Sequence, residues 1–99
     1  MKNISDMSIL ITGGGSGIGE GTASYFVKHG AKVTICGRNK DKLENVSKKL
    51  GNSCHAVKCD ITKNDERINL IEEAINHGQK LNALINNAGN MLRGPITDL

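Results

Sequence analysis

Apolar and polar positions along the 99-residue chain form two alternating patterns, short continuous apolar runs and longer stretches with helical spacing. The apolar runs are rich in β-branched residues and are bounded by glycine or polar residues, as strands buried on both faces of a sheet are. The sequence therefore predicts strands at residues 8–12, 32–37, 54–58 and 81–86. No linker or low-complexity segment separates them, so we expect residues 1–99 to belong to a single domain, of which they form the N-terminal part.

Between these strands, apolar residues recur at every third or fourth position, which is the spacing of one helix face. The sequence predicts three helices, each of which ends near a glycine. Asn39 is placed to cap the second helix, and Thr62 with Asp65 resembles a capping box that opens the third. The expected apolar faces are Ile18, Thr22, Tyr25, Phe26 and His29 in the first helix, Leu43, Val46 and Leu50 in the second, and Ile68, Ile71 and Ile75 in the third.

Strands that alternate with helices through short connections are typical of an α/β fold, in which helices cover both faces of a parallel sheet. The composition agrees, because apolar residues make up 37% of the chain and 12 glycines add to them, as in an ordinary globular domain. We therefore expect an α/β three-layer sandwich.

Charge and hydropathy exclude two classes of partner. The 13 Lys and Arg residues against 10 Asp and Glu give a net charge of +3, and they form no basic block of the kind that nucleic-acid binding needs. No apolar run approaches the roughly 18 residues of a membrane span. We expect neither a nucleic-acid partner nor a membrane.

The three cysteines bear on compartment and metal chemistry. Cys36, Cys54 and Cys59 are an odd number in a chain whose first apolar run is too short for a signal peptide, which favours the reducing cytoplasm. A zinc site built from these cysteines and His55 is disfavoured, because their spacing matches no common pair of zinc ligands. We expect no metal site.

Residues 13–21 carry the strongest chemical signal, because they hold six of the glycines and join the first strand to the first helix. A ligand can approach glycine backbone closely, and the helix N-terminus offers free N–H groups and the positive end of the helix dipole, so the segment favours a phosphate group. A P-loop is excluded, because Gly14-x-x-x-x-Gly19 is followed by Glu20-Gly21 rather than by Lys and a hydroxyl residue. A strict Gly-x-Gly-x-x-Gly motif is absent too.

Four short motifs stand at the carboxyl ends of the four predicted strands. They are Thr12-Gly13-Gly14-Gly15-Ser16-Gly17-Ile18-Gly19, Gly37-Arg38-Asn39, Asp60-Ile61 and Asn86-Asn87-Ala88-Gly89. In this order they resemble the short-chain dehydrogenase/reductase family, and the resemblance covers essentially the whole chain. It implies an incomplete NAD(P)-binding Rossmann fold with a parallel sheet in the order 3-2-1-4, whose ligand lies at the carboxyl edge of the strands.

The resemblance implies which residues of the glycine segment would hold the diphosphate of a dinucleotide. Gly13, Gly17 and Gly19 would shape the loop around the diphosphate. Ser16 and Ile18 would contribute backbone contacts to it.

The other motifs would hold the adenosine half of the same cofactor. By resemblance, Asp60 would hydrogen-bond the adenine amino group while Ile61 packs on the adenine ring. Asn87, Ala88 and Gly89 would stabilise the central strand and line the ribose.

Arg38 bears on the choice between NAD and NADP. In such folds an acidic residue about 20 positions after the glycine loop binds the ribose 2′-hydroxyl of NAD, whereas an Arg there accommodates the 2′-phosphate of NADP. Here the position is Gly37-Arg38-Asn39, with no carboxylate. We therefore expect NADP as the cofactor, with NAD as the alternative, because Ser16 stands where many NADP-binding members carry a basic residue.

The family's chemistry uses a Ser and a Tyr-x-x-x-Lys motif, and the resemblance implies no catalytic residue in this chain. The only tyrosine, Tyr25, is followed at the fourth position by His29 and belongs to the expected apolar face of the first helix. We expect the N-terminal segment of an NADP(H)-dependent oxidoreductase that interconverts a carbonyl or enoyl group of a small-molecule substrate and its reduced form. The alternative is a non-catalytic nucleotide-binding module or a truncated product. Because the fourth strand lacks a second neighbour, we also expect a homo-oligomer.

Overall fold

Each predicted apolar run forms a strand and each stretch of helical spacing forms a helix in the computed structural model, which describes residues 3–87. The first three strands have the predicted bounds. The fourth starts two residues later than predicted, because the side-chain oxygen Oδ1 of Asn82 accepts the Ser8 N–H at 2.8 Å. The elements are a 3₁₀ helix η1 (Ile4–Asp6), β1 (Ser8–Thr12), α1 (Gly17–Lys28), β2 (Lys32–Gly37), α2 (Lys40–Leu50), β3 (Cys54–Lys58), α3 (Asn64–Gly78) and β4 (Ala83–Asn86).

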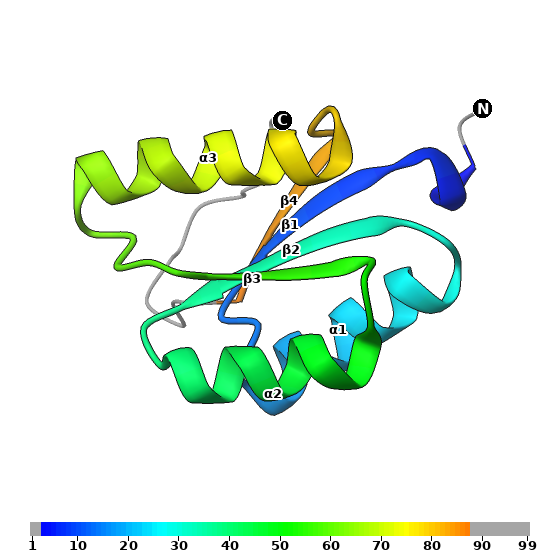
Figure 1. Ribbon diagram of the computed structural model, residues 1–99, viewed down its shortest axis with the longest axis horizontal. Coiled ribbons are helices and arrows are strands. Elements are labelled where there is room, and N and C mark those ends of the chain that lie inside the picture. Colours follow the sequence, from blue (N-terminus) through cyan, green and yellow to red (C-terminus); the bar gives the residue numbers. More distant parts are fainter. Residues whose placement is uncertain (1–2, 88–99) are drawn as a thin grey trace.

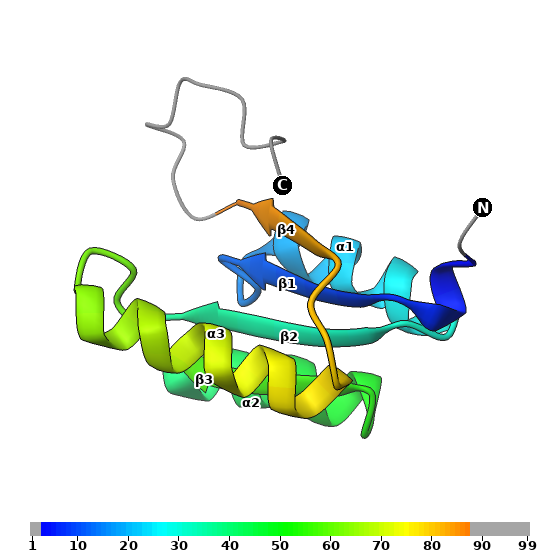
Figure 2. The ribbon, with the colours of Figure 1, turned by 90° about the horizontal axis from the view of Figure 1, so that it is seen from above.

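The strands form one parallel sheet in the order β3-β2-β1-β4, which confirms the prediction. Helix α3 covers one face of the sheet, and α1 and α2 cover the other, so the molecule has three layers (Figure 1). Figure 2 shows β4, β1 and β2 side by side from above, with α3 in front of β3. Thr12 pairs with both Cys36 and Asn86, so the carboxyl ends of three neighbouring strands are level at one edge.

Alternate residues of β1 fill the two apolar layers on either side of the sheet. Ile9 and Ile11 pack in the layer under α1 and α2, whereas Leu10 packs with Leu70 and Ala74 of α3. All five side chains are almost completely buried. Full burial of an aliphatic side chain of this size stabilises a fold by about 1.5–3 kcal/mol, so the sheet holds its carboxyl edge in a fixed position.

The predicted apolar face of α1 is correct at Phe26, which packs against the core, and wrong at Ile18 and Tyr25. The buried residues of the helix are Gly19 and Ala23, whereas Ile18 is 76% exposed and Tyr25 is 52% exposed. Tyr25 instead stacks at the surface against His29, with ring centroids 4.4 Å apart. Small residues form the buried face because they let the helix lie close to the sheet, which a pattern of large apolar residues does not indicate.

In α3 the predicted apolar face is not the face that is buried, so this prediction is wrong. Leu70 and Ala74 contact the sheet, whereas Ile68, Ile71 and Ile75 are between 38% and 55% exposed. The three isoleucines do share one side of the helix, but this side is not the one that rests on the sheet.

One of the two predicted helix caps is confirmed. The Lys42 N–H donates to Oδ1 of Asn39 at 3.1 Å, so Asn39 caps α2. The capping box at α3 is wrong, because Thr62 donates its hydroxyl to Asp60 at 2.7 Å and Lys63, which makes no side-chain cap, stands at the N-cap. The Thr62 hydroxyl, which was predicted to cap α3, is therefore hydrogen-bonded to Asp60 instead.

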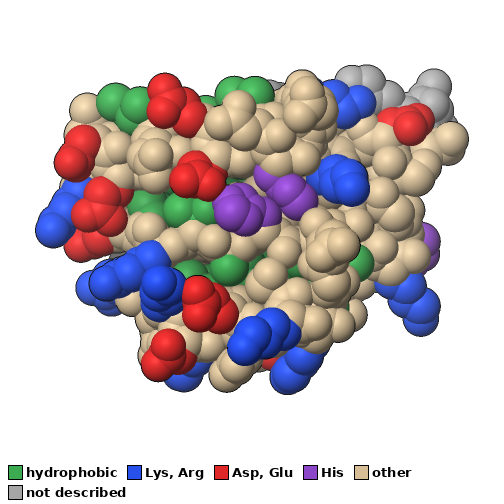
Figure 3. Space-filling model, in the orientation of Figure 1, with side chains coloured by type: hydrophobic (Ala, Val, Ile, Leu, Met, Phe, Trp, Pro, Cys, Tyr) green, Lys and Arg blue, Asp and Glu red, His purple; other side chains and the backbone are tan. Residues whose placement is uncertain are grey.

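The surface charges and the helices can be compared with the expectation of no nucleic-acid partner, no membrane and no metal site. Acidic and basic side chains are interspersed over the face that Figure 3 shows. No helix within residues 3–87 has both the length and the apolar character needed to cross a membrane. In the same part of the chain, no group of three or more His, Cys, Asp or Glu side chains is arranged to hold a metal ion.

Candidate functional site

The loop between β1 and α1 is fixed to the sheet by its glycines. Gly13 has φ +69°, a backbone conformation that side-chain-bearing residues rarely adopt. The Gly14 N–H donates to the carbonyl oxygen of Cys36 at 3.1 Å, and a Cβ on Gly14 would overlap the side chain of Ile35. The loop therefore rests directly on the end of β2.

Ser16 closes this loop onto the first turn of α1. Its hydroxyl donates to the Gly13 carbonyl at 2.8 Å and accepts the Gly19 N–H at 3.1 Å, so Ser16 is the N-cap of the helix. A Cβ on Gly19 would overlap the Gly13 carbonyl oxygen. Among the described residues, the N–H groups of Gly17 and Ile18 have no hydrogen-bond partner, as expected for the first turn of a helix.

Gly17 differs from Gly14 and Gly19 in its surroundings. A Cβ on Gly17 would meet no protein atom within 4 Å, and Gly17 has no positive φ. Neither packing nor backbone conformation requires glycine there. The open space at the Cβ position of Gly17 leaves room for a ligand at the start of α1, where the positive end of the helix dipole favours an anionic one.

Two neighbouring cavities lie where the loop meets the ends of the strands. The glycine-loop cavity, of about 300 Å³, is lined by Gly15, Ser16, Arg38, Asn39, Lys42 and Asn87 among others. The strand-end cavity, of about 330 Å³, is lined by Cys36, Arg38, Cys59, Asp60, Ile61 and Thr62 among others. Gly13, Gly37 and Arg38 belong to both cavities, so Arg38 lies at their common boundary.

Asp60 presents a negatively charged acceptor in the strand-end cavity. Its Oδ1 accepts hydrogen bonds from the Thr62 hydroxyl at 2.7 Å and the Thr62 N–H at 3.0 Å. These bonds, with smaller contributions from the charges of Arg38 and Lys63, hold the pKa of the Asp60 carboxyl below its ordinary value. Ile61 lies beside it and supplies apolar surface, so the cavity combines a hydrogen-bond acceptor with a surface on which a flat ring can pack.

Asn87 joins the loop to the end of β4. Its backbone N–H donates to Thr12 Oγ1 at 3.0 Å and contacts the Thr12 carbonyl oxygen at 3.2 Å. Its buried side-chain nitrogen Nδ2 has no hydrogen-bond partner within residues 3–87, although it belongs to a residue that lines the glycine-loop cavity. A buried donor without a partner is costly, so this nitrogen is suited to donate to a ligand. Ala88 and Gly89, expected beside it, lie outside the described residues.

Thr12 and Asn86 were not among the predicted site residues, yet they fix the geometry of this edge. The Thr12 hydroxyl donates to Asn86 Oδ1 at 2.8 Å while it accepts from Asn87. The signal was available in the sequence, because both residues belong to motifs at strand ends. Their role is to position Asn87, since the hydroxyl of Thr12 is already engaged.

The three thiols, of which Cys36 and Cys59 line the strand-end cavity, are not activated as nucleophiles. Cys36, Cys54 and Cys59 are free and buried. Burial raises the pKa of the Cys36 thiol to about 12 and that of Cys54 to about 11, and it raises the pKa of Cys59 as well. The thiol, rather than the nucleophilic thiolate, is the form present at neutral pH.

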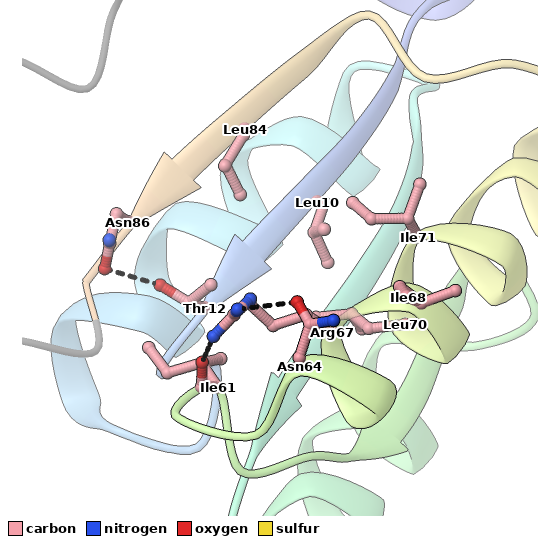
Figure 4. A pocket seen from close by; sticks show the side chains of 10 residues that line it. All are labelled: Leu10, Thr12, Ile61, Asn64, Arg67, Ile68, Leu70, Ile71, Leu84 and Asn86. Atoms are coloured by element: carbon pink, nitrogen blue, oxygen red, sulfur yellow. Dashed lines mark hydrogen bonds between the residues drawn. The ribbon is translucent and has the colours of Figure 1, made fainter.

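A third cavity, of about 340 Å³, lies on the α3 side of the sheet, beneath the exposed isoleucines of that helix. Figure 4 shows Leu10, Leu84, Ile68 and Ile71 around it, and Arg67 at one end donating to the Ile61 carbonyl at 2.6 Å. The lining is mainly apolar, and it includes none of the glycines of the loop. This groove therefore adjoins the strand-end cavity, with which it shares Ile61, but does not include the glycine loop.

Comparison with known proteins decides the family. A family model described as short chain dehydrogenase matches residues 7–99. The chain belongs to the short-chain dehydrogenase family. An uncharacterized oxidoreductase of Staphylococcus aureus (strain MRSA252) is 44% identical to this short-chain dehydrogenase over 99 residues, which are 99% of the chain and 43% of the relative.

Solved structures of short-chain dehydrogenases share the fold. A 3-ketoacyl-(acyl-carrier-protein) reductase from Brucella melitensis, complexed with NADH, is 40% identical, with a TM-score of 0.79 over 82% of this chain and 34% of that one. A short chain dehydrogenase from Bacillus anthracis is 34% identical, with a TM-score of 0.83 over 89% of this chain and 37% of that one. Our short-chain dehydrogenase chain thus spans less than half the length of these relatives.

The structure brings most of the predicted site residues of this short-chain dehydrogenase to one edge. Gly13, Ser16, Arg38, Asp60, Ile61 and Asn87 line the two adjoining cavities. Gly17 and Ile18 open α1 next to them, and Gly19 holds the helix against the loop. Lys42, which the sequence analysis did not single out, lines the glycine-loop cavity as well.

Proposed function

We propose that the chain is the cofactor-binding N-terminal segment of an NADP(H)-dependent oxidoreductase that interconverts a carbonyl or enoyl group and its reduced form. The observation that carries the proposal is the position of Arg38 at the boundary of the two cavities. No Asp or Glu residue lines the glycine-loop cavity. On the glycine-loop side of the boundary no carboxylate competes for the Arg38 guanidinium, whereas Asp60 lies on the strand-end side, so the guanidinium suits a phosphate in the glycine-loop cavity. The NAD-binding alternative would need an acidic residue at this place.

The two cavities suit the two parts of an adenosine 2′-phosphate. The strand-end cavity would hold adenine, with Ile61 against the ring and Asp60 accepting from the amino group. Because Arg38 lies at the common boundary, a ribose attached to that adenine would place its 2′-phosphate within reach of the guanidinium. Arg38 would bind the phosphate through two parallel N–H donors, the geometry in which Arg–phosphate contacts are strongest.

The remaining residues of the site fit the diphosphate and the second ribose. The N–H groups of Gly17 and Ile18 would donate to the diphosphate oxygens, and the open space above Gly17 gives them access. Nδ2 of Asn87 would donate to a ribose oxygen and so gain the partner that it lacks among the described residues. When bound, the nicotinamide supplies a hydride that reduces the substrate, and the chain described here binds and orients that cofactor.

Calorimetric titration with NADPH and NADH tests the proposal. We expect the wild-type protein to prefer NADPH, and Arg38→Ala to weaken NADPH binding by about ten- to a hundredfold, the equivalent of one charge-assisted contact. NADH is the internal control, because it shares every contact except the 2′-phosphate. Equal affinity of the wild-type protein for both cofactors, or an unchanged preference in Arg38→Ala, would show the proposal to be wrong.

We also propose a cytoplasmic location and a homo-oligomeric state. Free thiols at Cys36, Cys54 and Cys59 suit a reducing compartment. Within residues 3–87, β4 pairs with β1 alone, and its other edge can accept a further strand of this protein or a second copy. Light scattering on the purified protein tests the oligomeric state, and a strictly monomeric protein would contradict this part of the proposal.

A further inference from the structure

Lys42 lies in a defined position at the start of α2. Asn39 fixes the first turn of this helix, because its side-chain Oδ1 accepts the Lys42 N–H and its carbonyl oxygen accepts the Leu43 N–H, both at 3.1 Å. Leu43 is buried in the core under the helix. The backbone of Lys42 is therefore held both by the cap and by the packing of the next residue.

The same turn of α2 lies against the glycine loop. A Cβ placed on Gly15 would be 3.2 Å from Cβ of Lys42 and 3.8 Å from the Leu43 nitrogen. A side chain at position 15 would be in tight contact with this turn, so glycine favours the close approach of the two segments. As a result the Lys42 side chain starts at the loop and lines the glycine-loop cavity with Ser16 and Arg38.

The charges around this cavity are of one sign. Its lining includes two cationic side chains, Arg38 and Lys42, and no carboxylate. Lys40, two positions earlier on the same helix, lies outside the lining, with its Nζ 3.9 Å from Glu44 in an exposed pair. The cation that serves this cavity from α2 is therefore Lys42 and not its neighbour.

We propose that Lys42 is a second specificity-determining residue for the adenosine 2′-phosphate, which it would bind together with Arg38. The inference rests on the proposed NADP(H) function and adds to it a residue from another element. Ser16 occupies the place where the loop itself could carry a basic residue, and its hydroxyl is engaged with Gly13 and Gly19. Lys42 supplies a point charge beside the planar guanidinium, so a dianionic phosphate is neutralised from two sides.

The test uses small probes that isolate the 2′-phosphate. Calorimetric titration of the protein with 2′,5′-ADP and with 5′-AMP measures how much the 2′-phosphate adds to affinity. Lys42→Met keeps most of the aliphatic stem but removes the charge, and we expect it to weaken 2′,5′-ADP about five- to twentyfold, as the loss of a charged contact does. Binding of 5′-AMP should change less than about twofold.

The matched control is Lys40→Met, which removes an equal charge from the same helix turn. It should leave both probes within about twofold of the wild-type protein, since an exposed charge outside the cavity contributes little. If Lys40→Met and Lys42→Met weaken 2′,5′-ADP equally, the effect is general surface charge and the assignment of Lys42 is overturned.

Arg38→Ala separates this inference from the function on which it rests. If Arg38→Ala removes the preference for 2′,5′-ADP and Lys42→Met does not, the NADP(H) proposal stands and the inference about Lys42 is wrong. If the wild-type protein binds 2′,5′-ADP and 5′-AMP equally, the NADP(H) proposal is wrong and the inference falls with it. Loss of preference in both variants, with Lys40→Met unchanged, is the result we expect.

Discussion

Replacing Gly17 by Ala separates what the fold requires at this position from what a ligand requires. A Cβ on Gly17 would meet no protein atom within 4 Å, and Gly17 is the first residue of α1. Ala is favoured over Gly in a helix by up to about 1 kcal/mol, so the variant should be at least as stable as the wild-type protein. For a domain of this size, 1 kcal/mol corresponds to a rise in Tm of about 4–8 °C.

The same methyl group would stand outside the N–H donors of Gly17 and Ile18 and keep a diphosphate away from them. Each charge-assisted hydrogen bond contributes about 1.5–3 kcal/mol, so the loss of one or more of them should lower affinity by at least about tenfold. NADPH and NADH should be weakened equally, because both carry the diphosphate. Gly17→Ala should therefore raise or preserve stability while it lowers affinity.

Gly21 provides the control for this experiment. It lies one turn further along α1, is exposed, and would also accept a Cβ without contact within 4 Å. Gly21→Ala should gain helix stability and bind both cofactors as the wild-type protein does. Urea unfolding followed by circular dichroism gives the stabilities, and calorimetric titration gives the affinities. Wild-type binding by Gly17→Ala would refute the reasoning, because the diphosphate would then not lie against the first turn of α1.

Two further outcomes follow from buried polar groups and thiols. Thr12→Val removes the donor to Asn86 and one of the two acceptors of the Asn87 N–H, since the Thr12 carbonyl oxygen remains. Urea unfolding should show a loss of about 1–3 kcal/mol, and an unchanged stability would contradict this. Because burial raises the pKa of Cys36 from 9.0 to about 12, its thiolate fraction at pH 8 should be about a thousandfold lower than that of an exposed thiol. Timed alkylation with mass spectrometry should find Cys36 protected in the folded protein and reactive in guanidinium. The protection should be lost as the pH rises toward 12. Rapid alkylation of the folded protein at pH 8 would contradict this prediction.

The strands could be predicted from the sequence because burial on both faces demands continuous apolar, β-branched runs. Residues 8–12 and 32–37 have no polar alternation that would suggest another structure, and the glycines after them mark their ends. The buried face of α2 could be predicted from Leu43, Val46 and Leu50, but those of α1 and α3 could not be predicted in the same way. In α1 the contact is made by Gly19 and Ala23, whose small size is the reason for the close approach and also the reason that a hydrophobic pattern overlooks them.

Some candidate site residues could be predicted from the sequence, and one could not. Arg38, Asp60 and Asn87 could be predicted because each follows a strand of a parallel sheet, and the carboxyl ends of such strands meet at one edge. Lys42 could not, since it comes from the first turn of a helix, and only the contact with Gly15 shows that this turn lies against the loop. Whether a helix residue reaches a site depends on packing distances that no local pattern contains.

The small buried face of α1 links the interior of the protein to its ligand site. The height of this helix above the sheet is set by Gly19, against the Gly13 carbonyl, and by Ala23, which is completely buried one turn later. The N–H groups of Gly17 and Ile18, which have no partner within residues 3–87, move with the helix, so their height above the strand ends depends on Ala23 in the core as well as on the loop. A larger side chain at Ala23 would raise those donors away from the diphosphate, and such a core substitution would be detected as a change in cofactor affinity. Side chains at exposed positions of the same helix can vary without this effect. Ile18 is an example, because only its backbone N–H would contact the ligand and its side chain is exposed.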